Sequence, residues 1–303
     1  MSTKPLFAAI ETGGTKCLVS VGRDPNSATR YQIETAYPDE TANATELIIL
    51  DEIGRDTLDA IGIASFGPLN VDVESSDYGR IGPTPKPLWE GFNLRSHLQR
   101  RFDCPVMSES DVNGAALAEA AWQLDRPINH VAYVTVGTGI GVGVVQNRTI
   151  ANGLSHPEIG HIRVKKHATD HAFPGVCPFH GDCLEGLASG PAIHSRWGAS
   201  LSDLGTEHPA LALEAFYLGQ LAVNLILHHR PEVIIVGGGV SQTPMLLERM
   251  RTECLALLGD YLPELACADS MAKLITPPRL GEDSGILGAF MLAQRAFSRA
   301  NNS

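Results

Sequence analysis

The sequence lacks any run of about 18 apolar residues, the length that a membrane-spanning helix requires. The apolar stretch over residues 6–10 stops at Glu11, which is too early for the hydrophobic region of a secretory signal. Low-complexity tracts are absent as well. We therefore expect a cytoplasmic protein that has no membrane partner.

Basic residues are in short supply. The chain has 23 Lys and Arg against 34 Asp and Glu, a net charge of −11. An acidic chain is not expected to bind nucleic acid or an anionic membrane surface. Phosphate-bearing small molecules stay possible, because backbone amides and a magnesium ion bind them locally.

Cysteine is also scarce, with six in 303 residues. In a cytoplasmic protein such cysteines are reduced thiols or metal ligands and do not form disulfides. Hydrophobic residues make up 44% of the chain, which is ample for a core. The length fits two domains or one large α/β unit.

Short apolar strands separated by glycines are what the sequence does contain. Residues 6–10 and 17–21 read as strands joined by a turn at Gly13-Gly14, and a strand–turn–strand unit differs from a Walker A loop, which leads into a helix. Residues 131–136 and 140–145 repeat this pattern around a second glycine turn. The weak internal repeat predicts two similar α/β domains that face each other.

The glycine turns are candidate phosphate sites. The first offers open amides, a hydroxyl from Thr12 or Thr15 and the Lys16 ammonium, although for this turn alone a plain hairpin with a surface lysine is the favoured interpretation. Alternating glycines in the second turn indicate close approach by a ligand, so the two turns together would clamp a polyphosphate. Gly237-Gly238-Gly239 lies between a strand and a helix, where nucleotides bind in α/β domains, or is simply a tight turn.

Asp111 lies where a strand at residues 105–107 gives way to an alanine-rich helix at 112–122. The positive end of a helix dipole keeps such a carboxylate ionised. Ser110 or Asp111 could cap the helix. Asp111 could instead be a general base that accepts a hydroxyl proton during phosphoryl transfer.

A compact metal-ligand set is the strongest motif. Its members are His161, Cys177, His180 and Cys183. Four nitrogen and sulfur ligands fill a tetrahedron, which predicts a structural zinc ion (Zn²⁺). His156, His167 and His171 lie nearby as alternative ligands, and an incidental cluster is the other interpretation.

Glu158 and Glu185 flank the metal set. Carboxylates held beside a rigid loop can accept hydrogen bonds from vicinal hydroxyls, as in sugar binding. Surface acids are the default interpretation of any glutamate.

Together these motifs resemble the ROK family of sugar kinases (repressor, open reading frame, kinase) over nearly the whole chain. The resemblance rests on residues 11–16, 109–111, 136–143, 158–161 and 183–185. Finer features resemble the bacterial fructokinase branch: 65–69, Tyr78-Gly79, Thr84-Pro85-Lys86-Pro87 and 177–186.

The resemblance implies an α/β fold of two domains, actin- and hexokinase-like (ribonuclease H-like), with a zinc-binding loop at about residues 156–190. Residues 1–120 plus 284–303 would form the small domain and 121–283 the large one, with ATP, Mg²⁺ and sugar in the cleft. It also implies a homodimer.

Residue roles carry over from the same resemblance. Asp111 would deprotonate the sugar 6-hydroxyl, and Gly67 would lie against the sugar. Glu158, His161 and Glu185 would bind sugar hydroxyls, with His161 also binding zinc. The phosphate and nucleotide residues would be Gly13, Gly14, Thr15, Lys16, Gly137, Thr138, Gly139, Pro191, Gly237, Gly238 and Gly239.

Two positions depart from the family pattern. Many members have Asn where this chain has Ser110, and many have Asp where it has Glu11, which leaves the magnesium role of Glu11 open. The expected activity is ATP-dependent phosphorylation of D-fructose to fructose 6-phosphate.

Three alternatives accompany this expectation. The first is a kinase for glucose, mannose or an N-acetylhexosamine. The second is a ROK repressor, which the early first strand disfavours because it leaves no room for an N-terminal helix-turn-helix. The third is a non-catalytic, zinc-stabilised sugar-binding protein.

Overall fold

The computed structural model describes residues 4–122 and 128–302. The chain forms two compact units. The first comprises Met1–Trp122, Thr149–Pro157 and Glu282–Ser303, and the second comprises Gln123–Arg148 and Glu158–Gly281. The segment 149–157, placed in the large domain from the sequence, thus groups with the N-terminal residues.

A mixed sheet forms the centre of the first unit, with strand order β3-β2-β1-β4-β5. Its strands are β1 (Phe7–Thr12), β2 (Lys16–Gly22), β3 (Thr29–Glu34), β4 (Ala60–Ser65) and β5 (Val106–Ser110). β1, β2 and β3 pair antiparallel, whereas β1, β4 and β5 run parallel. The helices of this unit are α1 (Pro38–Ile53), α2 (Leu94–Phe102), α3 (Asp111–Ala121) and α10 (Ser284–Asn301).

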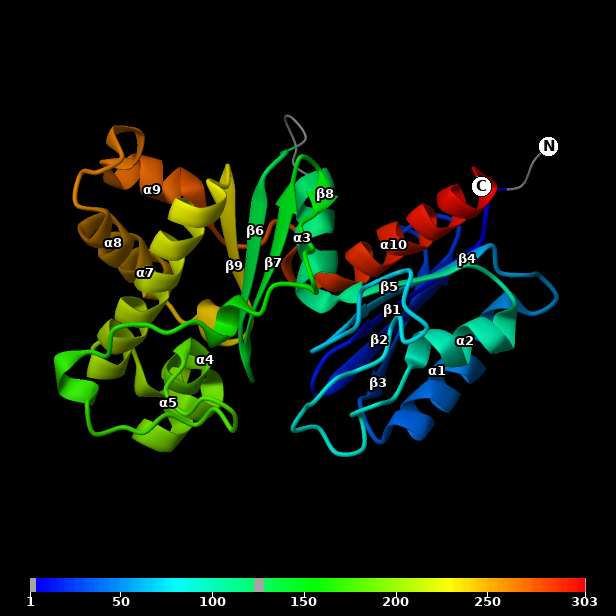
Figure 1. Ribbon diagram of the computed structural model, residues 1–303, viewed down its shortest axis with the longest axis horizontal. Helices are drawn as coiled ribbons and strands as arrows, with labels where there is room; N and C mark the ends of the chain where they lie inside the picture. The colour runs from blue at the N-terminus through cyan, green and yellow to red at the C-terminus, as the bar shows by residue number, and fades with distance from the viewer. Residues whose placement is uncertain (1–3, 123–127, 303) are drawn as a thin grey trace. The chain divides into compact units, whose positions relative to one another are not determined.

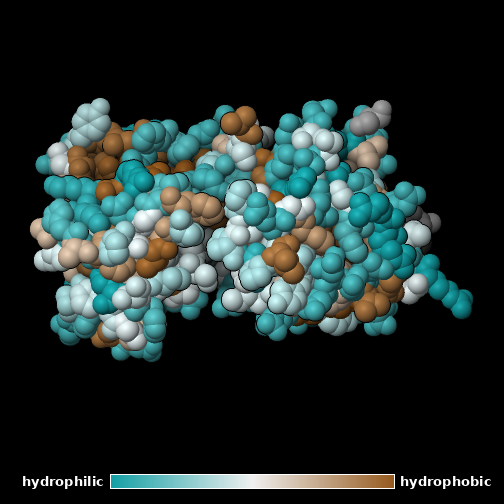
Figure 2. Space-filling model, turned by 60° about the horizontal axis from the view of Figure 1, so that its bottom comes forward, coloured by the Kyte–Doolittle hydropathy of each residue, from teal (hydrophilic) through white to brown (hydrophobic). Residues whose placement is uncertain are grey.

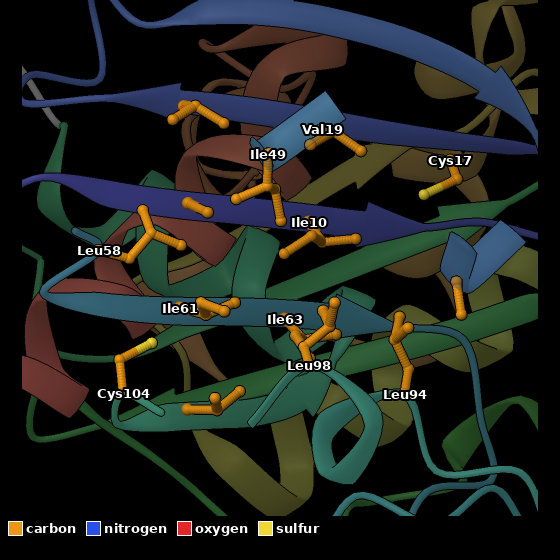
Figure 3. Close-up of a cluster of buried hydrophobic side chains, with 14 of the residues drawn as sticks. Ile10, Cys17, Val19, Ile49, Leu58, Ile61, Ile63, Leu94, Leu98 and Cys104 are labelled. Carbon is orange, nitrogen blue, oxygen red and sulfur yellow. The ribbon is translucent and has the colours of Figure 1, made fainter. Parts of the chain in front are cut away.

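Side chains alternate along each strand, and both faces of the sheet carry a buried apolar cluster. Ile10 and Ile63 point into a core that includes Ile49 of α1 and Leu98 of α2 (Figure 3). Phe7 and its neighbours on the other face pack against α10. In Figure 1, α1 and α2 accordingly lie on one side of the sheet and α10 on the other.

A second five-stranded sheet repeats the strand plan in the order β10-β9-β6-β7-β8. Its strands are β6 (Val131–Val136), β7 (Ile140–Gln146), β8 (Thr149–Ile150), β9 (Val233–Gly237) and β10 (Ile275–Thr276). The β6–β7 pair is antiparallel and the β6–β9 pair parallel, as for β1–β2 and β1–β4. The internal repeat predicted from the sequence is therefore present in the topology.

Helices supply the remainder of the second unit. They are α4 (Leu184–Ala188), α5 (Gly190–Trp197), α6 (Leu201–Leu204), α7 (Pro209–His229), α8 (Leu246–Leu258) and α9 (Ala268–Leu274). Short 3₁₀ helices occur at Ile159–His161, Ala168–Asp170, Val240–Gln242 and Pro263–Leu265, with a further one at Gly281–Asp283.

By length and composition alone, α7 could cross a membrane. In the structure, however, 67% of its apolar window is buried, as in the core helix of a globular unit. The molecular face in Figure 2 is largely hydrophilic, with apolar side chains in scattered patches.

Candidate active site

The parallel strands β1, β4 and β5 end side by side, and their carboxyl ends form one edge of the first sheet. Thr12 ends β1, Ser65 ends β4 and Ser110 ends β5, and the strand register pairs Thr12 with Ser65 and Ser65 with Ser110. The Thr12 hydroxyl donates to Ser65 Oγ at 2.8 Å. Since the carboxyl ends of parallel strands are where α/β sheets bind ligands, this edge brings the first glycine turn, Gly67 and Asp111 to one place.

The first glycine turn is held by backbone bonds. Gly13 N donates to Lys16 O at 2.9 Å, and Thr35 N donates to Thr15 O at 3.0 Å. At its tip Gly14 is exposed, and a Cβ there would meet nothing within 4 Å. The four residues predicted to bind phosphate, Gly13 to Lys16, thus form an open turn that a ligand can approach.

Asp111 is the first residue of α3. Ser110 is the N-cap, its Oγ accepting from Asn113 N at 3.3 Å, so of the two residues considered for this role Ser110 takes it. Asp111 Oδ1 accepts from Val112 N at 2.8 Å. Burial raises the pKa of Asp111 to about 6, and the hydrogen bond from Val112 N opposes this rise. A carboxylate with a pKa close to neutrality is a competent general base.

Glu109 accepts hydrogen bonds from the junction between β5 and α3. Its Oε1 accepts from Ser110 N at 2.9 Å and from Asn113 Nδ2 at 3.1 Å, and its Oε2 accepts from Asn152 Nδ2 at 2.7 Å. These bonds connect β5, α3 and the segment 149–157. We expect them to fix the backbone that carries Asp111.

Glu11 is a second buried carboxyl at this edge. Burial, followed by the negative charge of Asp111, raises the pKa of Glu11 to about 7. Its Oε2 is buried without a hydrogen-bond partner. Its carboxylate fits tightly against α10, since a Cβ on Gly285 would lie 2.3 Å from Glu11 Cδ. An unpartnered buried carboxylate oxygen fits a role toward a hydrated divalent cation.

Gly67 lies in a tight turn that ends in a cis Gly67-Pro68 peptide. A Cβ on Gly67 would lie 3.1 Å from the His156 ring, a tight contact that a glycine avoids. His156 Nε2 accepts from Leu69 N at 2.9 Å, and burial lowers the pKa of His156. His156 therefore holds the Gly67 turn.

In the second unit, three glycine segments pack together. Gly190 N, at the start of α5, donates to Gly137 O at 2.8 Å. A Cβ on Gly137 would lie 4.0 Å from Gly239 N, and one on Gly238 would lie 2.4 Å from Val136 O. The second turn, the loop 237–239 and Pro191, which follows Gly190, are thus gathered at one site, with Thr138 exposed between its glycines.

Glu185 is built into the same site. Its Oε2 accepts from Ile140 N at 3.0 Å, at the start of β7, and lies 2.6 Å from the position of a Cβ on Gly139. The carboxylate predicted to bind sugar therefore lies directly beside the second glycine turn. Glu158, the other predicted carboxylate, is exposed just before the 3₁₀ turn that carries His161.

The predicted metal ligands converge. The donor atoms of His161, Cys177, His180 and Cys183 all lie within 4.8 Å of one another. His161 Nδ1 is 3.4 Å from Cys183 Sγ and 3.7 Å from Cys177 Sγ, and His180 Nδ1 is 3.7 Å from Cys177 Sγ. Tetrahedral zinc with ordinary Zn–S and Zn–N bonds sets these separations at about 3.6 Å. The donor set fits zinc.

The alternative ligands lie outside this cluster. His156 belongs to the first unit, and His167 Nδ1 instead accepts from Thr169 N at 3.2 Å. Within residues 4–122 and 128–302, His171 is not among the clustered donors either.

The segment that carries the four donors, residues 161–183, is called the metal loop here. Buried polar contacts anchor it to the helices of the second unit. Asp170 accepts two hydrogen bonds from Arg196, at 2.9 and 3.0 Å, and one from the Tyr217 hydroxyl at 2.6 Å. Arg196 also lies over the Phe173 ring, 3.9 Å from its centroid. The loop is therefore held at two places, by this network and by the donor cluster.

Two residues of this region have no predicted role in the site: Glu109, and His156, which the sequence offers only as an alternative metal ligand. The signal for Glu109 was its place beside Ser110 and Asp111 in the family motif. His156 had no local signal, because its hydrogen bond to Leu69 joins residues 87 positions apart.

The chain is similar to known proteins over nearly its full length. The ROK family model matches residues 7–296. The chain is 38% identical to a putative fructokinase of Bacillus subtilis, with 96% of each chain covered. It is 38% identical to a fructokinase of Zymomonas mobilis, covering 97% of this chain and 98% of the relative.

Solved structures show the same fold. A ROK hexokinase from Thermus thermophilus superposes with a TM-score of 0.75 at 25% identity, covering 98% of this chain and 100% of the other.

Proposed function

Because this chain belongs to the ROK family, we propose that it is an ATP-dependent fructokinase, which converts D-fructose to fructose 6-phosphate. The near full-length similarity to fructokinases supports the substrate. The branch features noted in the sequence, such as Thr84-Pro85-Lys86-Pro87, support it as well.

The observation that carries the proposal is the shared edge of β1, β4 and β5. It sets a carboxylate of raised pKa, Asp111, beside an open glycine turn and the Gly67 turn. A phosphoryl-transfer site needs a base for the hydroxyl and amide donors for the phosphates, and little covalent chemistry of its own.

The chemistry of the proposed reaction is a single displacement. The sugar O6 forms a bond to the γ-phosphorus of ATP as the bond from that phosphorus to the bridging oxygen breaks, so ADP leaves. The O6 proton passes to the Asp111 carboxylate. Glycine-turn amides hold the phosphates, and Glu11 would face the Mg²⁺ that accompanies ATP. Positioning and charge stabilisation provide the acceleration.

The second unit would supply the remaining contacts. Gly137, Thr138 and Gly139 would bind phosphate, and Pro191 with Gly237, Gly238 and Gly239 would bind the nucleotide. Glu158, His161 and Glu185 would accept or donate hydrogen bonds at sugar hydroxyls.

The metal loop would have a structural role. His161, Cys177, His180 and Cys183 would hold zinc, which would stabilise the loop without activating water, because four protein ligands complete its coordination. His161 presents Nδ1 to the thiol groups. Its Nε2, on the opposite side of the ring, is then the atom available to a sugar. We also expect a homodimer located in the cytoplasm.

A sugar panel tests this function. ADP release is measured with ATP and Mg²⁺ on fructose, glucose, mannose and N-acetylmannosamine, and the phosphorylated product is identified. Fructose should give the highest kcat/KM, and the product should carry phosphate on O6.

The other outcomes are equally informative. Faster turnover of another hexose would replace fructose as the substrate. Sugar binding without ATP turnover would indicate a repressor or a binding protein. The Asp111→Asn variant, purified in parallel, controls for contaminating kinases.

A further inference from the structure

Lys86 reaches the first glycine turn from a distant part of the sequence. Its Nζ donates to the carbonyl oxygen of Gly14 at 2.5 Å, across 72 positions of the chain. Gly14 is the open tip of the turn. The contact therefore brings a second ammonium group to a turn that already contains Lys16.

Buried aromatic packing holds the segment that carries Lys86. Trp89 is fully buried, and its ring packs edge-on against Phe66 at 5.1 Å and Phe92 at 5.6 Å. Trp89 N donates to Lys86 O at 3.3 Å, which closes a turn around residues 86–89. The backbone of Lys86 is thus fixed three residues from a rigid anchor.

Residues 35 and 36 connect the segment that carries Lys86 with the first glycine turn. The Trp89 indole N–H donates to Ala36 O at 2.9 Å. The preceding residue, Thr35, bonds the glycine turn through its amide to Thr15 O and through its hydroxyl to Gly13 O at 2.9 Å. Lys86 and the turn are therefore held in register by adjacent residues, and the contact at Gly14 is a product of the fold.

The charge of Lys86 is not neutralised by a neighbour. Lys16 lies 3.5 Å from the Glu282 carboxylate. Among the residues that the structure describes, no carboxylate lies within ion-pairing distance of Lys86. Its ammonium group instead donates to a neutral carbonyl, that of Gly14. A carbonyl positions an ammonium group but leaves its charge available to an anion.

We propose that Lys86 is a phosphate-binding residue of this kinase, with its ammonium group contacting the terminal phosphates of ATP at the first glycine turn. This inference rests on the proposed function. During transfer, Lys86 keeps its proton and stabilises the negative charge on the equatorial oxygens of the γ-phosphoryl group. The O6 proton still passes to Asp111.

Three substitutions test the proposal. Lys86→Met removes the charge and the donor, Lys86→Gln keeps an N–H donor without charge, and Lys86→Arg keeps the charge. Dissociation constants for Mg·ATP and for adenosine are measured by calorimetry, together with kcat and KM for each substrate. Lys273→Met is the control, because Lys273 is an exposed lysine of α9 in the second unit.

The Met and Gln variants should each bind Mg·ATP about tenfold more weakly or lose about tenfold in kcat/KM for ATP, since a charge-assisted phosphate contact is lost. Adenosine affinity and melting temperature should not change. The Arg variant should stay within about threefold of wild type.

Two results would overturn the proposal. In one, Lys86→Gln behaves as wild type, which would reduce Lys86 to a hydrogen-bonding support for Gly14. In the other, adenosine and Mg·ATP weaken equally, which would exclude a phosphate contact. A wild-type protein that binds Mg·ATP but phosphorylates no sugar refutes the fructokinase function alone, and the binding comparison still decides the role of Lys86.

Discussion

Asp111 derives its chemistry from its immediate neighbours. Ser110 caps α3, so the Asp111 carboxylate is not used as the helix cap. Burial raises its pKa to about 6, whereas the hydrogen bond from Val112 N keeps that rise limited. Glu109 fixes the backbone beneath it. The helix cap Ser110 thus lies between a supporting carboxylate, Glu109, and the proposed base, Asp111.

Asp111→Asn should lower kcat by about 10²–10⁴, because the amide cannot accept the hydroxyl proton. Fructose affinity, measured by calorimetry, should change little. Turnover within tenfold of wild type would show that Asp111 is not the base.

The acid limb of the pH profile should reflect the same carboxyl. A base acts only when ionised, so kcat/KM for fructose should fall as the pH drops through about 6, the raised pKa of Asp111. Steady-state rates in overlapping buffers measure this limb. A rate that stays constant well below that value would contradict the assignment.

At the scale of elements, two loops are shaped by contacts that lie far apart in the sequence. His156 holds the Gly67 turn through Leu69 N. The metal loop is held by its donor cluster and by the contacts of Asp170 with Arg196 and Tyr217. Each predicted site residue on these loops depends on such a tether for its position.

Metal analysis should find about one zinc per chain, on the four-ligand reasoning. Cys177→Ser should lose the metal, lower the melting temperature and raise KM for fructose more than it lowers kcat, because the loop carries the proposed sugar-binding groups and not the proposed base. Cys267→Ser is the matched control, since Cys267 is exposed and lies outside the donor cluster. A fully active, zinc-free preparation would refute the role of the loop.

At the scale of the whole molecule, the chain's C-terminal helix completes the N-terminal unit. α10 packs on the face of the first sheet that Phe7 and Ala9 line. It also meets α3 at a glycine contact, where a Cβ on Gly288 would lie 2.1 Å from Gly114 O. The fold of the first unit therefore requires residues from both ends of the chain.

Gly288→Ala should destabilise the protein by about 2–3 kcal/mol, because backbone atoms meet the added methyl and cannot rotate away as a side chain could. Chemical denaturation monitored by circular dichroism measures this loss. Gly153→Ala, where a Cβ would meet nothing within 4 Å, is the control. Equal stabilities for the two variants would show that the α3–α10 contact relaxes at little cost.

The sequence alone determined the two strand–glycine–strand units, the donor set of the metal loop and the family, because these depend on local spacing and composition. The hairpins at β1–β2 and β6–β7 are confirmed, and the four donors do converge. Elements with weaker local patterns, such as α1 and α2, were not predicted.

Only the tertiary structure decided which of those residues act together. The register of β1, β4 and β5 aligns Thr12, Ser65 and Ser110, and so brings Asp111 to the first glycine turn. The contacts of Lys86 with Gly14 and of His156 with Leu69 join segments 72 and 87 positions apart. No periodicity encodes such pairings, because they follow from how buried strands and aromatic anchors pack in three dimensions.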